Sequence, residues 1–243
     1  EAMDKYGRDA PDLRFGLPLT DLSDTLRDRI EFRIFAGTLA DGGMVKALHI
    51  PDGKAFTRKD LDRTIPEEAA VFGAKGVAWA RVSEGGVWSG PVAKGIDEAL
   101  RGEVNELLGA SEGSLILFVA DKASVANASL ARLRIVAGER LGLIDPKAWA
   151  FCWVVDFPMF EYSAEDGRFY AMHHPFTSPR DSDQHLLESD PGAALANAYD
   201  LVVNGVEMGG GSIRIHRSDV QSKVFEILGL SPAAARKLLE YQW

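Results

Sequence analysis

The dipeptide Asn204-Gly205, set between two apolar stretches, constrains this chain more than any other feature of its sequence. Asn-Gly is the pair that best supports a two-residue β-hairpin turn, because both turn positions need a positive φ. If these two residues form the loop, Val202 pairs with Glu207 on the opposite strand. The sequence therefore predicts an antiparallel hairpin within residues 199–216.

Two carboxylates of this hairpin are expected on one face. Asp200 stands two residues from Val202, the expected partner of Glu207, so both acids lie on the same side of the sheet. Diagonal neighbours of this kind lie roughly 7–8 Å apart at the backbone. Such a pair suits a hard cation such as Mg²⁺, which takes one or two carboxylates plus substrate phosphates. An ordinary amphipathic hairpin with a solvated acidic face is the alternative.

Arg214 joins the acidic face only if the second strand is irregular. It lies seven residues after Glu207, and strict alternation would place it on the opposite face. A one-residue β-bulge in the glycine run Gly209–Gly211 would reverse that parity. We therefore predict a bulge within residues 208–212, and a regular ladder there would contradict this idea.

A pair of adjacent histidines is the second candidate feature. His173 and His174 lie at the end of a predicted strand, so they point to opposite faces. A neutral imidazole at this place could hydrogen-bond a small carboxylate or amine substrate. A zinc site is disfavoured, because the other histidines of the chain do not stand at ligand-like spacings. A purely structural histidine remains the alternative.

The composition excludes some classes of protein. The formal net charge of −9 argues against binding nucleic acid by bulk electrostatics. No apolar run approaches the ~20 residues that span a bilayer, and no signal peptide is visible. The single cysteine, Cys152, lies in an apolar run and is expected to be a buried hydrophobe rather than a catalytic thiol. A cytoplasmic protein without a membrane segment is expected.

The expected elements indicate an α+β fold in three parts. Residues 1–16 are polar and without hydrophobic periodicity, as in a connector. Residues 17–148 form a compact module with strands over 31–35, 45–50, 76–82 and 113–120 and helices over 57–72, 96–108 and 124–141. Residues 149–243 hold antiparallel hairpins of a larger sheet domain, into which the module is inserted.

The third part is expected to begin with a long strand over 150–161, interrupted by Asp156. We interpret Asp156 as a paired, buried structural acid; a carboxylate that supports a ligand-binding residue is the alternative. The chain returns as a strand over 168–176. Helices are predicted over 191–198, 218–228 and from Pro232 onward. Ser218 and Gln221 have the spacing of a capping box at the start of the second helix.

Several long motifs resemble the bacterial-type aspartyl-tRNA synthetases, a class II family. They are Ala2-Met-Asp-Lys-Tyr-Gly-Arg-Asp-Ala-Pro-Asp-Leu-Arg14, Trp153-Val-Val-Asp-Phe-Pro158, His173-His-Pro-Phe-Thr-Ser-Pro179 and the stretch 197–216. The resemblance extends to about Arg236. It implies that 1–16 is a connector of the catalytic domain, 17–148 the inserted α+β GAD domain, and 149–243 part of the antiparallel-sheet catalytic domain.

The resemblance also implies roles for four residues. His173 would bind the aspartate substrate and Arg214 its side-chain carboxylate, while Glu207 would bind ATP, and Asp200 and Glu207 the Mg²⁺ that accompanies it. No catalytic residue is assigned. The implied reaction joins L-aspartate to ATP as aspartyl adenylate, releases pyrophosphate and transfers the aspartyl group to tRNA. The family's enzymes are expected to be homodimers.

Some parts of the family pattern are missing from these residues. They are the anticodon-binding barrel, the first class II motif with its dimer helix, the core of the second motif and the third motif. We therefore expect this chain by itself to be inactive. The alternative is a non-catalytic, GAD-centred module that binds tRNA or a partner protein. Retention of His173, Asp200, Glu207 and Arg214 favours descent from the enzyme.

Overall fold

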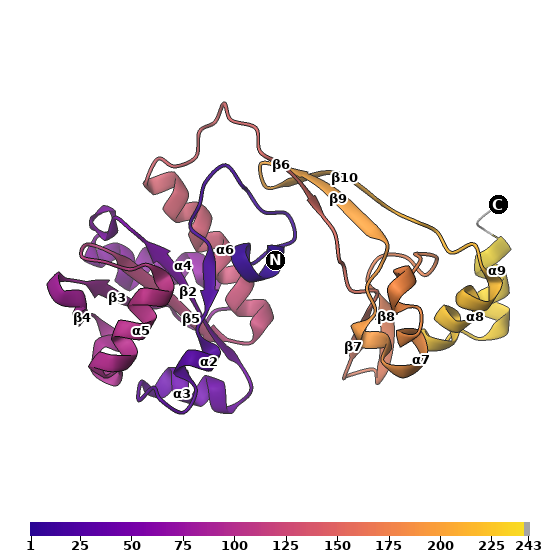
Figure 1. Cartoon of the computed structure of the whole chain (residues 1–243), viewed down its shortest axis with the longest axis horizontal. Helices are drawn as coiled ribbons and strands as arrows, with labels where there is room; N and C mark the ends of the chain where they lie inside the picture. Colours follow the sequence, from indigo (N-terminus) through magenta and orange to yellow (C-terminus); the bar gives the residue numbers. More distant parts are fainter. Residues whose placement is uncertain (241–243) are drawn as a thin grey trace. The chain divides into compact units, whose positions relative to one another are not determined.

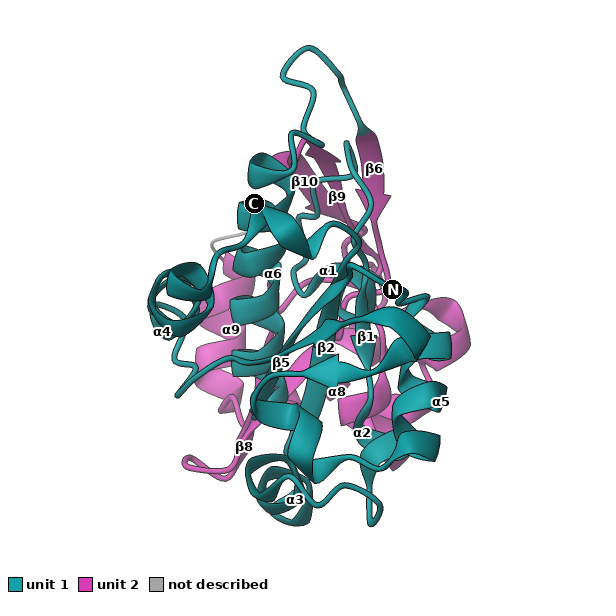
Figure 2. Ribbon diagram, turned by 90° about the vertical axis from the view of Figure 1, so that its left-hand side faces the viewer, with its two compact units in different colours: residues 1–150 teal, residues 151–243 magenta. Residues whose placement is uncertain are grey.

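The computed structural model describes residues 1–240, so the last three residues of the predicted part 149–243 lie outside the described residues. Helices and antiparallel strands alternate along the chain, which confirms the α+β class (Figure 1). The chain divides into two compact units, Glu1–Ala150 and Phe151–Trp243 (Figure 2). Within residues 1–240, no helix is long and apolar enough to cross a membrane.

Unit 1 is a five-stranded antiparallel sheet with the order β1-β2-β5-β3-β4. Its strands are β1 (Leu19–Asp21), β2 (Met44–Ile50), β3 (Ala78–Val82), β4 (Trp88–Ser89) and β5 (Leu115–Asp121). Its helices are α1 (Ala2–Tyr6), α2 (Ser23–Leu26), α3 (Arg33–Ala40), α4 (Ile65–Ala70), α5 (Glu98–Leu108) and α6 (Ala123–Arg140). Short helical turns lie at Gly53–Ala55, Asp60–Thr64, Glu84–Gly86 and Pro91–Gly95.

Helices cover both faces of this sheet. Alternate residues of the central strand β5 enter separate apolar cores: Leu115 and Leu117 pack with α4 and α6, whereas Ile116 and Phe118 pack with α2, α3 and α5. Because successive strand residues point to opposite faces, the unbroken apolar run of β5 follows from its burial on both sides.

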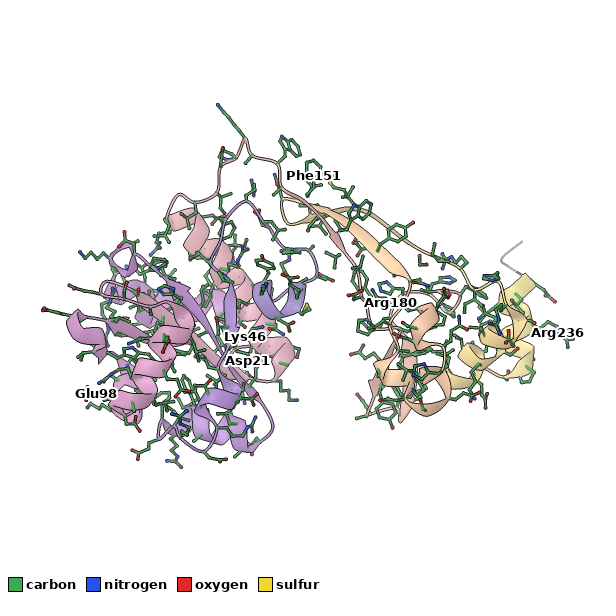
Figure 3. All side chains as sticks on the ribbon, viewed as in Figure 1. Asp21, Lys46, Glu98, Phe151, Arg180 and Arg236 are labelled. Carbon is green, nitrogen blue, oxygen red and sulfur yellow. The ribbon has the colours of Figure 1, made fainter. Side chains whose placement is uncertain are left out.

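Residues 1–16 pack against the rest of unit 1. The buried Lys46 of β2, labelled in Figure 3 beside its β1 partner Asp21, donates from Nζ to Asn127 Oδ1 at 2.6 Å and to the Met3 carbonyl at 3.1 Å. The boundary between the two units falls after Ala150, two residues beyond the predicted one. Whether these segments are the connector and the GAD insertion is taken up below as a proposal.

One predicted strand of unit 1 is wrong. Residues 31–35 were expected to be extended, but Arg33–Ala40 forms helix α3. Phe35 and Leu39 stand four residues apart and are both buried, which is a helical period. The other predicted strands and helices of 17–148 are confirmed, with boundaries shifted by a few residues.

Unit 2 contains two antiparallel sheets and a group of helices. The strands are β6 (Phe151–Val154), β7 (Phe160–Ser163), β8 (Arg168–Ala171), β9 (Ala198–Val203) and β10 (Val206–Ser212). The first sheet has the order β10-β9-β6, and β7 pairs with β8. The helices are α7 (Leu186–Ser189), α8 (Ser218–Ile227) and α9 (Pro232–Glu240), with short turns at Asp181–Asp183 and Pro191–Ala193.

Four local predictions for unit 2 are wrong. The strand expected over 168–176 ends at Ala171, so His173 and His174 lie beyond it rather than at its end. The long strand over 150–161 is divided into β6 and β7, because Asp156 adopts φ +66° and Pro158 cannot donate to a ladder. The predicted helix over 191–198 is a single short turn, after which Ala198 begins β9. The capping box of α8 does not form; Arg217 precedes the helix and bonds to Asp219.

Candidate substrate-binding site

The Asn204-Gly205 hairpin forms with the predicted register. Asn204 and Gly205 have φ of 53° and 82°, and Val202 is the partner of Glu207. The ladder then shifts between Glu207 and Gly209, so Met208 is an extra residue on β10. The predicted bulge is therefore present, but at Met208, just before the glycine run rather than in it. Past the bulge, Gly210 lies opposite Asp200.

The bulge brings both carboxylates over one glycine. A Cβ built on Gly210 would overlap Asp200 Oδ1, lie 3.1 Å from the Asp200 carboxyl carbon and lie 3.2 Å from Glu207 Oε1. Both acids thus converge on the same point, although Asp200 is half-buried and Glu207 is exposed. Neither carboxylate is in an ion pair among residues 1–240.

Arg214 follows β10 on the same side. Ser212, opposite Ala198, shares the face of Gly210, and Arg214 is two residues further along an extended chain. That chain is held by the bridge between Thr177 and Arg214 and by the hydrogen bond from Ser178 N to the Ile213 carbonyl, 2.8 Å. The segment after the histidines is therefore the neighbour of the Arg214 segment.

The two histidines have different surroundings. The His173 ring meets the Phe157 ring edge-on, with centroids 4.7 Å apart. His174 Nδ1 accepts a hydrogen bond from the Phe176 backbone N–H at 3.3 Å. Partial desolvation lowers the pKa of the exposed His174, and the positive charge of Arg214 lowers it further. His174, which the sequence analysis did not assign, therefore lies within the electrostatic reach of Arg214.

Arg180 is a residue that sequence reasoning missed. It forms an ion pair with Asp156, whose left-handed backbone ends the first strand of unit 2 (Figure 3 labels Arg180). The predicted pairing of Asp156 is confirmed, but the pair is partly exposed rather than buried. Nothing in the sequence near Asp156 indicated a partner 24 residues away.

Cys152 does not have the features of a reactive thiol. It lies on β6 opposite Val202, the residue that also pairs with Glu207, and it is partly buried. Burial raises the pKa of its thiol, which disfavours the thiolate that a nucleophile needs. This agrees with its predicted role as a small apolar residue.

The oxygen atoms of Asp200 and Glu207 are chemically suited to a magnesium ion. They are hard ligands, and no group of three or more His, Cys, Asp or Glu side chains suited to a metal occurs among the described residues. Two carboxylates leave most coordination positions to water and phosphate, as Mg²⁺ prefers.

A cavity of about 560 Å³ in unit 1, lined by Phe32, Lys75 and Lys122 among others, contains none of the candidate residues.

Comparison with known proteins identifies the family to which this chain belongs. Residues 1–242 match the family described as "tRNA synthetases class II (D, K and N)", and the chain belongs to this family. This confirms the resemblance inferred from the motifs.

Individual relatives are more specific. The chain is 50% identical over 237 residues to "Aspartate--tRNA ligase" of Lysinibacillus sphaericus, covering 97% of the chain and 40% of the relative. It is 50% identical over 236 residues to "Aspartate--tRNA(Asp/Asn) ligase" of Bacillus subtilis, covering 97% and 39%, and 48% identical over 239 residues to the aspartate--tRNA ligase of Staphylococcus carnosus, covering 98% and 40%. The chain thus spans about 40% of the length of these relatives.

Proposed function

We propose that this chain is part of an aspartate--tRNA ligase and that unit 2 supplies one wall of its adenylate-forming site. The observation that carries the proposal is the convergence of Asp200 and Glu207 over Gly210, with Arg214 on the same side of the strand. The activation of an acidic amino acid requires acids that hold a metal-bound nucleotide. It also requires a guanidinium that binds the carboxylate of the amino acid.

In this proposal Arg214 binds the side-chain carboxylate of L-aspartate, because a guanidinium can form two parallel hydrogen bonds to such a group. His173, exposed beside Phe157, contacts the same substrate. Glu207 binds ATP, and Asp200 and Glu207 together hold its magnesium ion. When bound, Mg²⁺ neutralises negative charge that develops on the phosphates.

The four residues act by binding and orientation. Arg214 and His173 fix the aspartate so that its α-carboxylate faces the α-phosphorus of ATP, and holding the two reactants together lowers the entropic part of the barrier. The products are aspartyl adenylate and pyrophosphate, and the aspartyl group then passes to the terminal ribose hydroxyl of tRNA with release of AMP.

Roles for the other segments follow from the same assignment. Residues 1–16 are proposed as the connector of the catalytic domain, 17–148 as the inserted GAD domain and 149–243 as part of the catalytic domain. The complete enzyme is proposed to be a cytoplasmic homodimer. The first sheet of unit 2 carries large apolar side chains that are more than half exposed: Phe151, Trp153, Val206 and Met208. Exposed apolar surface of this kind usually marks a contact with further protein, which supports the proposal that unit 2 is part of a larger domain.

The test uses the complete polypeptide encoded by the reading frame that contains this chain. Asp200→Asn, Glu207→Gln and Arg214→Gln should each lower aspartate-dependent ATP–pyrophosphate exchange by about 100-fold or more. Arg214→Gln should act chiefly through the KM for aspartate, and Glu207→Gln through ATP. Glu161→Gln, an exposed acid on β7, is the matched control and should retain activity. Full exchange activity in the Asp200 and Glu207 variants would refute the proposal.

A further inference from the structure

The three consecutive glycines of β10 lie in three different environments. A Cβ on Gly209 would have open space around it, a Cβ on Gly210 would meet Asp200 and Glu207, and a Cβ on Gly211 would meet Tyr199. None of the three has a positive φ. Their backbone therefore does not require glycine, and any requirement must come from what occupies the space beside each residue.

At Gly210 that space is filled by the acids of the site. The overlapping atom, Asp200 Oδ1, is the end of a side chain rather than backbone, and the Asp200 carboxyl carbon lies 3.1 Å from the same point. A methyl group there would leave the strand in place and turn the carboxylate away from Glu207. The missing side chain of Gly210 is thus what allows the two carboxylates to converge.

At Gly211 the space is filled by an aromatic ring. The Tyr199 hydroxyl lies 2.9 Å from a Cβ position and its ring carbons at 3.1 and 3.3 Å. Tyr199 is the cross-strand partner of Gly211, and its ring meets Trp153 edge-on with centroids 5.9 Å apart. Since Gly211 follows Gly210, this contact lies on the opposite face of the sheet from the acids. Gly211 therefore serves packing.

We propose that Gly210 is a positioning residue of the nucleotide–metal site, whose lack of a side chain lets Asp200 and Glu207 converge on one metal ion. Gly209 and Gly211 have no such role. The metal part of this inference rests on the proposed function. The geometric part, the dependence of the Asp200 position on Gly210, stands on the contacts alone.

The experiment compares Gly209→Ala, Gly210→Ala and Gly211→Ala in the complete polypeptide. Mn²⁺ replaces Mg²⁺, and electron paramagnetic resonance measures its binding in the presence of a non-hydrolysable ATP analogue. Thermal unfolding is followed in parallel. Gly210→Ala should weaken Mn²⁺ binding about tenfold or more, the range seen when the residues that orient metal ligands are changed. Its unfolding midpoint should stay near that of the parent protein.

The neighbouring glycines are the matched controls. Gly209→Ala should change neither measurement. Gly211→Ala should lower the unfolding midpoint, because Tyr199 must move, and should leave Mn²⁺ affinity unchanged. Mn²⁺ binding by Gly210→Ala equal to that of Gly209→Ala would overturn the role of Gly210.

Two further comparisons separate the possible failures. If Asp200→Asn and Glu207→Gln leave Mn²⁺ binding unchanged, the proposed metal site itself is wrong. If they weaken it and Gly210→Ala does not, only the role of Gly210 is wrong. Should Gly210→Ala prove unstable, a double-mutant cycle of Gly210→Ala with Asp200→Ala decides. The effect of Gly210→Ala on stability and on Mn²⁺ binding must disappear in the Asp200→Ala background, because the overlapping carboxylate is then absent. A loss that persists without Asp200 would contradict the inference.

Discussion

Arg134 Nη2 donates a hydrogen bond of 2.7 Å to the carbonyl of Phe15, and its guanidinium carbon lies 4.0 Å over the ring of the same residue. The guanidinium also donates to the carbonyls of Asp12 and Gly16 from Nη2 and of Leu17 from Nε. Arg134 of helix α6 thereby satisfies four backbone carbonyls of residues 12–17, a segment that forms no helix or strand. A single buried side chain thus holds the path of this segment within unit 1.

Replacing Arg134 with Met should therefore destabilise unit 1. The change leaves four carbonyls without their donor, and an unsatisfied buried group costs about 1–3 kcal/mol. We expect a loss of about 3 kcal/mol or more in the free energy of unfolding by urea. Arg132→Met is the matched control on the same helix. Its pair with Glu68 is about one-third exposed, so it should cost less than ~1 kcal/mol.

Two helical glycines should respond oppositely to alanine. A Cβ on Gly138 of α6 would lie 2.7 Å from Phe15 Cε2 and 2.9 Å from Cζ. Overpacking of this kind costs about 1–3 kcal/mol, which exceeds or cancels the ~1 kcal/mol that alanine gains in a helix. Gly138→Ala should therefore not stabilise the protein. Gly102→Ala, on the exposed face of α5 with no atom within 4 Å, should stabilise it by about 1 kcal/mol. Urea unfolding of both variants measures this contrast.

The stability of unit 1 should depend on pH through Asp60. Hydrogen bonds from the Thr57 backbone and Arg140 lower the pKa of this carboxyl from 3.8 to about 2. A lowered folded-state pKa means that the stabilisation is fully present above pH 3.8 and is lost as pH falls toward 2. Because the group is near solvent, about 1 kcal/mol is expected. Asp60→Asn should be less stable than the parent at pH 5, and this difference should shrink between pH 4 and 2.

Much of the site was accessible from sequence because its geometry is local. The Asn204-Gly205 turn fixes which residues pair, and pairing fixes that Asp200 and Glu207 share a face. The bulge at Met208 was predictable only through the assumption that Arg214 joins that face. The sequence did not predict that the extra residue is Met208. Glycine is the residue expected at a bulge, but the three glycines pair regularly with β9.

The failures concern tertiary effects. Residues 31–35 contain Phe32, Ile34 and Phe35, which suit a strand, but burial of Phe35 and Leu39 in the core selects a helix. The break comes from the left-handed backbone of Asp156, and the ion-pair partner of its side chain, Arg180, is distant in sequence. The convergence over Gly210 depends on side-chain positions that no alternation pattern specifies.

The proximity of Arg214 and His174 gives a direct test of the substrate side of the site. Partial desolvation is the main cause of the lowered pKa of His174, and the Arg214 charge adds to it. Arg214→Gln removes the second cause only, so the pKa of His174 should rise without fully regaining the ordinary value for histidine. Titration of the imidazole resonances by NMR measures this in the parent and the variant. Arg168→Gln, on β8, is the control, and an equal pKa of His174 in the parent and Arg214→Gln would show that the Arg214 side chain points elsewhere.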